Sequence, residues 1–270
     1  MYVGTFELTQ KVYIASDSPN KSVLLTGISG SGKTTRLNQM ELELVNCGET
    51  VLVVDVNQTH SWHHIYQEIR EQFFPVTNYI HVVRDGMGNG LLDPLNERED
   101  LVNLINSAVY ALSANLNMGS RQIGVLRQAV IAAAEYRYAF NSEAEAITSA
   151  LLSRDDAIGE VVYNKLWTVL NCGALRPSGK AIQRGRINIL DLSGLDLLTQ
   201  SVLSEVLLAM IWRRVQTEDT PRGNITLVFD ECQNLSWKKD AMIRRFLCEG
   251  RKFGLQLLLA TQTTEVFAKD

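Results

Sequence analysis

The sequence predicts a three-layer α/β fold with a mainly parallel central sheet and a helical insertion. Continuous apolar runs recur along the chain and alternate with stretches of helix-forming residues. Such runs are typical of parallel strands whose two faces are both covered. The expected strands are residues 22–26, 50–55, 79–83, 187–192, 224–231 and 255–262. The expected helices of the sheet region are residues 34–46, 197–215 and 240–251.

Three regions are expected along the 270 residues. Residues 1–20 are predicted to form a short N-terminal β segment, and residues 21–97 and 171–270 the sheet-containing core. Residues 98–170 are predicted to form the helical insertion, because apolar residues recur there at spacings of three and four. A chain of this length suits one large α/β domain that carries such an insertion.

The composition is ordinary for a globular protein, with 46% apolar residues, 21% charged residues and a net charge of −4 at pH 7. Contact with nucleic acid would therefore require a local basic patch or an oligomeric channel. The four cysteines lack metal-ligand spacing, which indicates free thiols in a reducing compartment. Residues 1–20 lack a secretory pattern, and charges interrupt the apolar stretch 195–215, so we expect a cytoplasmic protein without a membrane span.

A glycine-rich motif follows the first expected core strand. Residues 27–34 match the phosphate-binding template G-x-x-x-x-G-K-[ST] at every fixed position. The glycines let backbone N–H groups turn towards phosphate oxygens, and the following helix presents its N-terminus to them. Lys33 is expected to reach the β- and γ-phosphates of ATP, and the Thr34 hydroxyl to hold Mg²⁺. The expected nucleotide-binding set is Gly27, Ile28, Ser29, Gly30, Ser31, Gly32, Lys33, Thr34 and Thr35.

Two acids follow the apolar run 225–229. Asp230 is suited to support the Mg²⁺, and Glu231 is suited to polarise an attacking water. The alternative is a pair of solvated acids at a strand end. Gln262 ends the next apolar run, where an amide could sense the γ-phosphate or position water; a polar loop residue is the equally weighted alternative.

Arg251 precedes the last strand by a few residues. An arginine there could enter a neighbouring subunit's nucleotide site and stabilise the transition state. A solvated basic face is the alternative, since Arg244, Arg245 and Lys252 are close in the sequence.

Taken together, these motifs resemble the ATPase core of the HerA/FtsK superfamily of DNA-translocating motors, and most closely its HerA-like branch. The same group includes conjugation and type IV secretion ATPases. The segments that carry the resemblance are residues 26–35, 53–55, 91–95, 189–195, 228–231, 250–255 and 259–262. The ending Gly250-Arg251-Lys252-Phe253-Gly254 followed by Ala260-Thr261-Gln262 is more specific than the phosphate loop alone.

The resemblance implies a RecA-like ATPase that assembles as a homohexamer, hydrolyses ATP with Mg²⁺ at subunit interfaces and moves double-stranded DNA through the ring. A nuclease or another effector protein is the implied partner. Lys33, Glu231 and Gln262 match the family's catalytic positions, and Thr34 and Asp230 match its metal ligands. Arg251 matches the arginine that a neighbouring subunit supplies, with Arg244 and Arg245 as substitutes.

Two other functions stay open at this stage. One is a conjugation or type IV secretion ATPase that moves a protein or a DNA–protein complex. The other is a nucleotide-dependent assembly module with little turnover. His60, His63 and His64 stand near Trp62 and are interpreted either as a nucleic-acid contact or, more commonly, as a loop with a partly buried tryptophan. The basic residues Lys180, Arg184 and Arg186 are interpreted either as a DNA-backbone contact or as a solvated loop.

Overall fold

The computed structural model describes residues 1–6, 10–13, 21–87, 90–93, 100–176, 179–217, 224–238 and 241–267. Contacts divide the chain into two compact units. The first, here called the sheet unit, comprises Met1–Tyr79, Ile182–Ser193 and Pro221–Asp270. The second, here called the helical unit, comprises Ile80–Ala181 and Gly194–Thr220.

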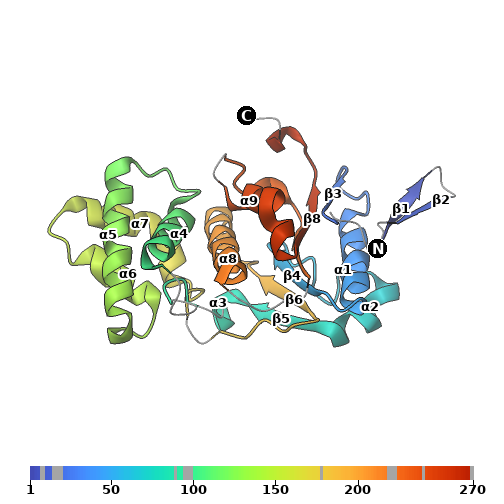
Figure 1. Cartoon of the computed structure of the whole chain (residues 1–270), viewed down its shortest axis with the longest axis horizontal. Helices are drawn as coiled ribbons and strands as arrows, with labels where there is room; N and C mark the ends of the chain where they lie inside the picture. Colours follow the sequence, from blue (N-terminus) through green and yellow to red (C-terminus); the bar gives the residue numbers. More distant parts are fainter. Residues whose placement is uncertain are drawn as a thin grey trace. The chain divides into compact units, whose positions relative to one another are not determined.

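The main sheet has six strands in the order β3-β8-β7-β4-β6-β5 (Figure 1). The pairings of β3 with β8, β8 with β7, β7 with β4 and β4 with β6 are parallel, which confirms the predicted fold class. The six residues of the central strand β4 are all buried, as in a parallel strand whose two faces are both covered. The strand bounds are β3 Val23–Thr26, β4 Thr50–Asp55, β5 Thr77–His81, β6 Ile187–Asp191, β7 Ile225–Phe229 and β8 Leu255–Thr261.

Helix α1 (Lys33–Asn46) supplies one wall of the core of the sheet unit. Its apolar residues Leu37, Met40 and Leu44 pack with Val51 and Val53 of β4. The other helices of this unit are α2 (Gln67–Phe73) and α9 (Met242–Glu249). Short 3₁₀ segments are η1 (Phe74–Val76), η3 (Cys232–Asn234), η4 (Gly250–Phe253) and η5 (Glu265–Phe267).

An antiparallel pair of short strands, β1 (Tyr2–Phe6) and β2 (Gln10–Tyr13), lies within the region expected to form an N-terminal β segment. This pair is a separate two-stranded sheet.

The helical unit is built from amphipathic helices whose apolar residues form its interior. The N-terminal ends of α4, α6 and α7 are capped by Asp100, Ser142 and Asp156, whose side chains accept a hydrogen bond from the backbone N–H two or three residues further along. The fully buried side chains include Leu104, Leu112, Leu126, Ile147 and Leu151. The bounds are α3 Val82–Asp85, α4 Leu101–Ser113, α5 Ser120–Tyr136, η2 Arg137–Ala139, α6 Glu143–Leu152, α7 Ala157–Asn171 and α8 Leu197–Thr217.

Strand β5 differs most from its prediction, because it begins and ends two residues earlier than expected. The expected strand 79–83 stops at His81, and Val82 and Val83 belong to α3. The side chain of Asp85 accepts a hydrogen bond from the backbone N–H of His81 at 3.0 Å, which turns the chain into this short helix. Apolar residues alone did not reveal this turn, because Val82 and Val83 suit a strand as well as a helix.

The expected core boundaries at residues 97/98 and 170/171 stay a prediction. Contacts instead group residues 80–93 and α8 with the inserted helices. Pro94, Leu95, Arg98 and Asp240, which the sequence analysis also used, lie outside the described residues. No helix among the described residues is long and apolar enough to cross a membrane.

Candidate nucleotide-binding site

The glycine-rich segment forms a tight loop between β3 and α1. Gly30 and Gly32 have φ values of 77° and 86°, which side-chain-bearing residues rarely adopt. A Cβ atom on Gly27 would lie 2.6 Å from the Ser31 hydroxyl, so any larger residue here would push that side chain aside. The Lys33 ammonium group donates to the backbone oxygens of Gly27 at 2.8 Å and Ile28 at 3.0 Å. The loop therefore curls around the lysine that the sequence analysis assigned to phosphate binding.

Helix α1 presents a favourable N-terminus to this loop. It begins at Lys33, its first turn contains no acidic residue, and no side chain caps it. Unpaired N–H groups and the helix dipole favour an anion at such an end. The loop and helix together can hold a chain of phosphates, as the sequence predicts.

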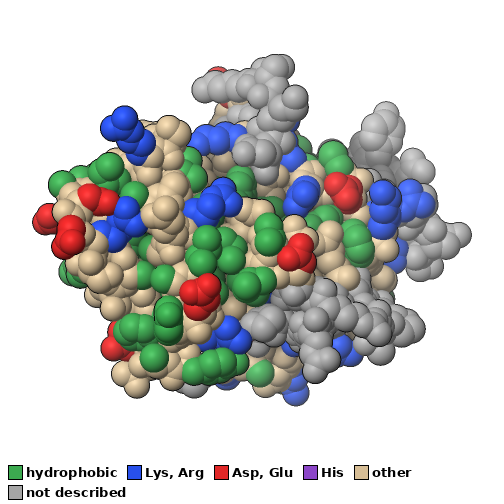
Figure 2. Space-filling view, turned by 60° about the vertical axis from the view of Figure 1, so that its left-hand side comes forward, with side chains coloured by type: hydrophobic (Ala, Val, Ile, Leu, Met, Phe, Trp, Pro, Cys, Tyr) green, Lys and Arg blue, Asp and Glu red, His purple; other side chains and the backbone are tan. Residues whose placement is uncertain are grey.

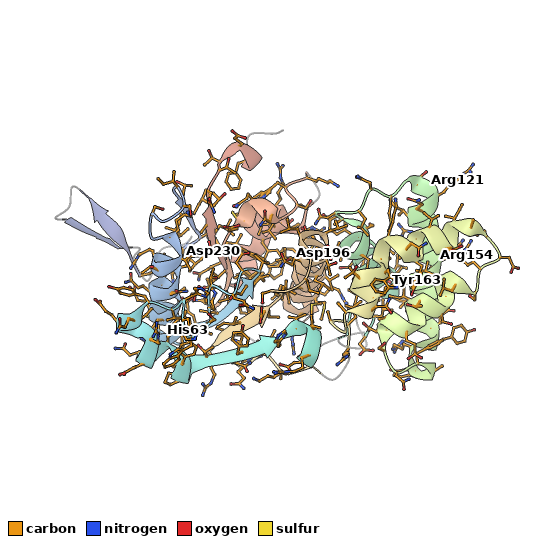
Figure 3. All side chains as sticks on the ribbon, turned by 180° about the vertical axis from the view of Figure 1, so that it is seen from behind. His63, Arg121, Arg154, Tyr163, Asp196 and Asp230 are labelled. Atoms are coloured by element: carbon orange, nitrogen blue, oxygen red, sulfur yellow. The ribbon has the colours of Figure 1, made fainter. Side chains whose placement is uncertain are left out.

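Thr34 and Asp230 lie next to each other although 196 residues separate them in the sequence. The Thr34 hydroxyl donates to Asp230 Oδ2 at 2.6 Å. Asp230 directly follows β7, and Figure 3 labels it. A hydroxyl and a carboxylate are the hard oxygen ligands that Mg²⁺ prefers, so these two residues fit a magnesium ion shared with nucleotide phosphates.

Glu231 and Gln262 lie at the ends of the neighbouring strands β7 and β8 and contact each other. The Gln262 amide nitrogen donates to Glu231 Oε1 at 2.8 Å. Glu231 adopts a left-handed backbone conformation with φ 63°, which is uncommon for a residue with a side chain. Strain of this kind clusters at functional sites. The structure thus brings together the predicted catalytic acid and the predicted sensor amide.

Gln233 is a polar residue near this site that the sequence analysis missed. Its Oε1 accepts a hydrogen bond from the Thr261 hydroxyl at 2.8 Å, which ties the segment after β7 to the end of β8. In the sequence, the one signal for Gln233 as a site residue is its position three residues after Asp230.

Arg251 stands apart from this cluster. It lies in η4 with an exposed side chain, and within the described part of the chain that side chain makes no hydrogen bond or ion pair. None of the hydrogen bonds described above for Lys33, Thr34, Asp230 and Glu231 involves Arg251. Its expected action on a neighbouring subunit stays a prediction.

A buried ionic network joins α1, the end of β4 and the loop that follows β4. The sequence analysis did not predict it. The His60 ring is fully buried, with Nε2 at 3.1 Å from both carboxylate oxygens of Glu41 in α1. Its Nδ1 lies 3.3 Å from Asp55 Oδ2, at the end of β4. Burial alone would lower the pKa of His60, but the charges of Glu41 and Asp55 outweigh burial and raise it to about 10. Burial likewise opposes ionisation of Asp55, but its bonds from His60 lower its pKa to about 2.

His60 is therefore buried away from any nucleic acid, whereas both interpretations of the exposed residues in the His60–His64 segment stay predictions. Trp62 is 51% exposed and stacks on Phe74 with ring centroids 4.7 Å apart, as expected of a loop with a partly buried tryptophan. His63, labelled in Figure 3, and His64 are exposed. No metal-ligand cluster occurs among the residues that the structure describes.

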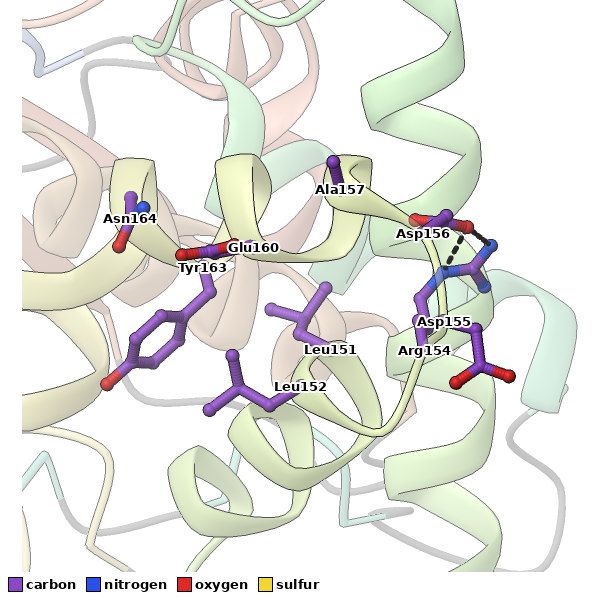
Figure 4. A pocket seen from close by; sticks show the side chains of 9 residues that line it. All are labelled: Leu151, Leu152, Arg154, Asp155, Asp156, Ala157, Glu160, Tyr163 and Asn164. Carbon is purple, nitrogen blue, oxygen red and sulfur yellow. Dashed lines mark hydrogen bonds and ion pairs between the residues drawn. The ribbon is translucent and has the colours of Figure 1, made fainter.

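The helical unit contains a separate cavity of about 400 Å³ (Figure 4). It lies between the end of α6 and the start of α7, where Leu151, Arg154 and Tyr163 are among its lining residues. None of the predicted nucleotide-binding residues lines it. The candidate phosphate site is therefore defined by the glycine-rich loop and its charged side chains, and this cavity is not part of it.

The parallel sheet, the loop at β3 and the acids after β7 define a RecA-like P-loop nucleoside-triphosphatase fold. Comparison with protein families agrees: the sequence profile of the AAA domain family matches residues 16–126, which include the phosphate loop. A search of curated proteins found no match.

Solved structures that share this fold include VirB4 and a conjugative coupling protein. VirB4 of Thermoanaerobacter pseudethanolicus is 14% identical, with a TM-score of 0.77 over 100% of this chain and 78% of that one. The bacterial conjugative coupling protein TrwBΔN70, in its unbound monoclinic form, is 13% identical, with a TM-score of 0.64 over 98% of this chain and 66% of that one.

The plasmid coupling protein TrwB in complex with ADP and Mg²⁺ is 14% identical, with a TM-score of 0.59 over 90% of this chain and 63% of that one. The chain thus spans about two thirds of the coupling-protein structures. At such low identities these likenesses establish the fold alone.

Proposed function

We propose that this chain is an ATP-hydrolysing motor of the conjugation or type IV secretion kind, which moves a protein or a DNA–protein complex. The observation that carries the ATPase part is the pairing of a phosphate loop with Thr34 and Asp230 at 2.6 Å. The fold shared with VirB4 and with the coupling protein supports the transport part. This likeness favours the secretion reading over the HerA-type movement of double-stranded DNA.

Each site residue has a definite task in this proposal. Lys33 exchanges its two backbone partners for phosphate oxygens, since an ammonium group bonds a phosphate more strongly than a neutral carbonyl. Thr34 and Asp230 hold Mg²⁺, which neutralises charge on the phosphates. Glu231 orients and polarises the attacking water once its bond from Gln262 opens. Gln262 is then free to contact the γ-phosphate or the water.

The mixed charges on one face of the described residues support the same choice. On the face seen in Figure 2, Lys and Arg side chains are spread among hydrophobic and acidic ones. With a net charge of −4, the chain offers little general attraction to DNA. The hexameric ring, double-stranded DNA and a nuclease or other effector as partners remain predictions from the sequence resemblance.

Steady-state hydrolysis of ATP with no nucleic acid, with single-stranded DNA and with double-stranded DNA tests the proposal. We expect Mg²⁺-dependent hydrolysis that double-stranded DNA does not specifically stimulate, with Lys33→Ala as the blank. Stimulation by double-stranded DNA alone would support the HerA-type motor instead. ATP binding without turnover under all three conditions would support the assembly-module reading.

A further inference from the structure

A buried ionic network joins the phosphate-loop helix to the loop that follows β4. Glu41 of α1 and Asp55 of β4 approach the same His60 ring from its two nitrogens. The exposed fractions of His60 and Glu41 are 0%, and that of Asp55 is 2%. Water therefore cannot replace any partner in this network, and its geometry is maintained only while all three residues stay together.

Attraction between the His60 ring and the two carboxylates holds this network in one arrangement. A protonated imidazole donates from both nitrogens, and here each nitrogen faces a carboxylate. Thr59 Oγ1 also lies 3.1 Å from Nδ1, and it bonds Asp55 as well. The other acid beside Asp55 is Asp191, its register partner in β6, which the Tyr79 hydroxyl bonds at 2.8 Å. Loss of the histidine would leave buried carboxylates without a counter-charge.

One end of this network is fixed to the nucleotide site. Glu41 follows Lys33 by eight positions in the same uninterrupted helix, which is about 12 Å along its axis. Lys33 and Thr34, at the start of that helix, are the residues that phosphate and Mg²⁺ would pull. A helix of this length moves as a unit, so a shift at its N-terminus reaches Glu41.

The other end organises the loop 56–66. Asp55 accepts backbone hydrogen bonds from Asn57, Thr59 and His60, so its position determines the path of the loop. The same loop carries the exposed Trp62, which Arg70 covers at 5.3 Å from the ring centroid. A change in the conformation of loop 56–66 would therefore alter the protein surface around Trp62.

We propose that His60 is a positioning residue that couples the place of α1, and hence occupancy of the nucleotide site, to the conformation of loop 56–66. The inference rests on the proposed ATP-binding function. It gives the surface around Trp62 a nucleotide-dependent shape.

Hydrogen exchange detected by mass spectrometry tests this coupling, with the non-hydrolysable analogue ADPNP and Mg²⁺ as the probe. In the unaltered protein we expect the analogue to slow amide exchange in residues 27–34 and also, about tenfold, in residues 56–66. In His60→Gln the analogue still protects 27–34, but the effect on 56–66 is lost. His64→Gln is the matched control, because His64 lies in the same loop and is exposed.

The outcomes separate the two proposals. Protection of 27–34 without any change at 56–66 in the unaltered protein overturns the coupling and leaves the ATP site intact. Equal protection of 56–66 in His60→Gln and in the unaltered protein also overturns it. No protection of 27–34 in the unaltered protein contradicts the proposed function itself, and the coupling fails with it. If His60→Gln does not fold, Glu41→Gln replaces it, with the same loss expected at 56–66.

Discussion

At the scale of residues, the site depends on contacts that only the fold could reveal. The sequence predicted Thr34 and Asp230 separately, each from its own motif, and the structure joins their side chains at 2.6 Å. The contact between Gln262 and Glu231 was not predicted, because it depends on β7 and β8 being neighbours. The His60 network was missed for the same reason: Glu41 and His60 are 19 residues apart and meet only when α1 packs beside β4.

Removal of the Thr34 hydroxyl should weaken the binding of Mg²⁺ at the nucleotide site. In Thr34→Ala the ion loses one ligand and Asp230 loses its hydrogen bond, so we expect the Mg²⁺ concentration for half-maximal ATP hydrolysis to rise about tenfold. Thr34→Ser keeps the hydroxyl and should behave like the unaltered protein. A titration with Mg²⁺ at fixed ATP measures this. Equal Mg²⁺ dependence for the alanine and serine variants would remove Thr34 from the metal site.

The His60 network should make stability depend on pH on the alkaline side. The pKa of His60 is raised from 6.5 to about 10 in the folded protein. The stabilisation that protonated His60 gives the folded protein is fully present below pH 6.5 and is lost as pH rises towards 10. The lowered pKa of Asp55 acts at the acid end: its contribution is present above 3.8 and is lost as pH falls towards 2.

Urea unfolding between pH 6 and pH 10 checks the alkaline limb. We expect the unaltered protein to lose stability across this range, and His60→Gln to lose about 3–5 kcal/mol at pH 6 and to show a flatter profile. His64→Gln serves as the control. Parallel profiles for the unaltered protein and His60→Gln would mean that the ring is neutral when buried.

At the scale of elements, the sequence predicted those features whose structure depends on residues close together in the chain. The phosphate loop was predicted because its glycines and its helix N-terminus act within eight residues. Strands β4 and β6 were predicted because every residue in them is buried, which gives continuous apolar runs in the sequence. The prediction for β5 was wrong by two residues at both ends, and the strand stops at His81, whose backbone N–H donates to the side chain of Asp85. Apolar patterning does not register such bonds.

Two glycines allow the loop's function to be separated from simple backbone strain. Gly32, before α1, and Gly48, after it, have φ values of 86° and 84°, and both have open space where a Cβ would lie. Gly32→Ala and Gly48→Ala should each cost about 1–2 kcal/mol of stability. Gly32→Ala alone should also abolish ATP binding, because the cradle changes shape. Binding measured by calorimetry, beside thermal unfolding, checks this; equal loss of binding in both variants would point to a general effect of strain.

At the scale of the whole molecule, the open question is whether copies of the chain complete each other's sites. Arg251 is exposed, and its side chain makes no hydrogen bond or ion pair among the described residues. The expected hexamer and the role of Arg251 in a neighbouring site could be predicted only from resemblance, since interfaces between copies leave no periodic pattern in one chain.

Mixing of two inactive variants tests this assembly. Arg251→Ala and Glu231→Gln should each hydrolyse ATP poorly alone, because each site lacks one partner. An equal mixture should regain activity, since some sites combine Glu231 from one chain with Arg251 from the next. A mixture of Arg251→Ala with the double variant should not. Full activity of Arg251→Ala alone would exclude Arg251 from catalysis.

The central claim is that residues 27–34, Asp230 and Glu231 form an ATP-hydrolysing site. Phosphate release from Mg²⁺-ATP, measured for the unaltered protein, Glu231→Gln and the exposed control Glu71→Gln, tests it most directly. We predict that Glu231→Gln binds ATP as before but hydrolyses it about 10²–10³-fold more slowly, while Glu71→Gln is unaffected. Hydrolysis by Glu231→Gln at the unaltered rate would contradict the account.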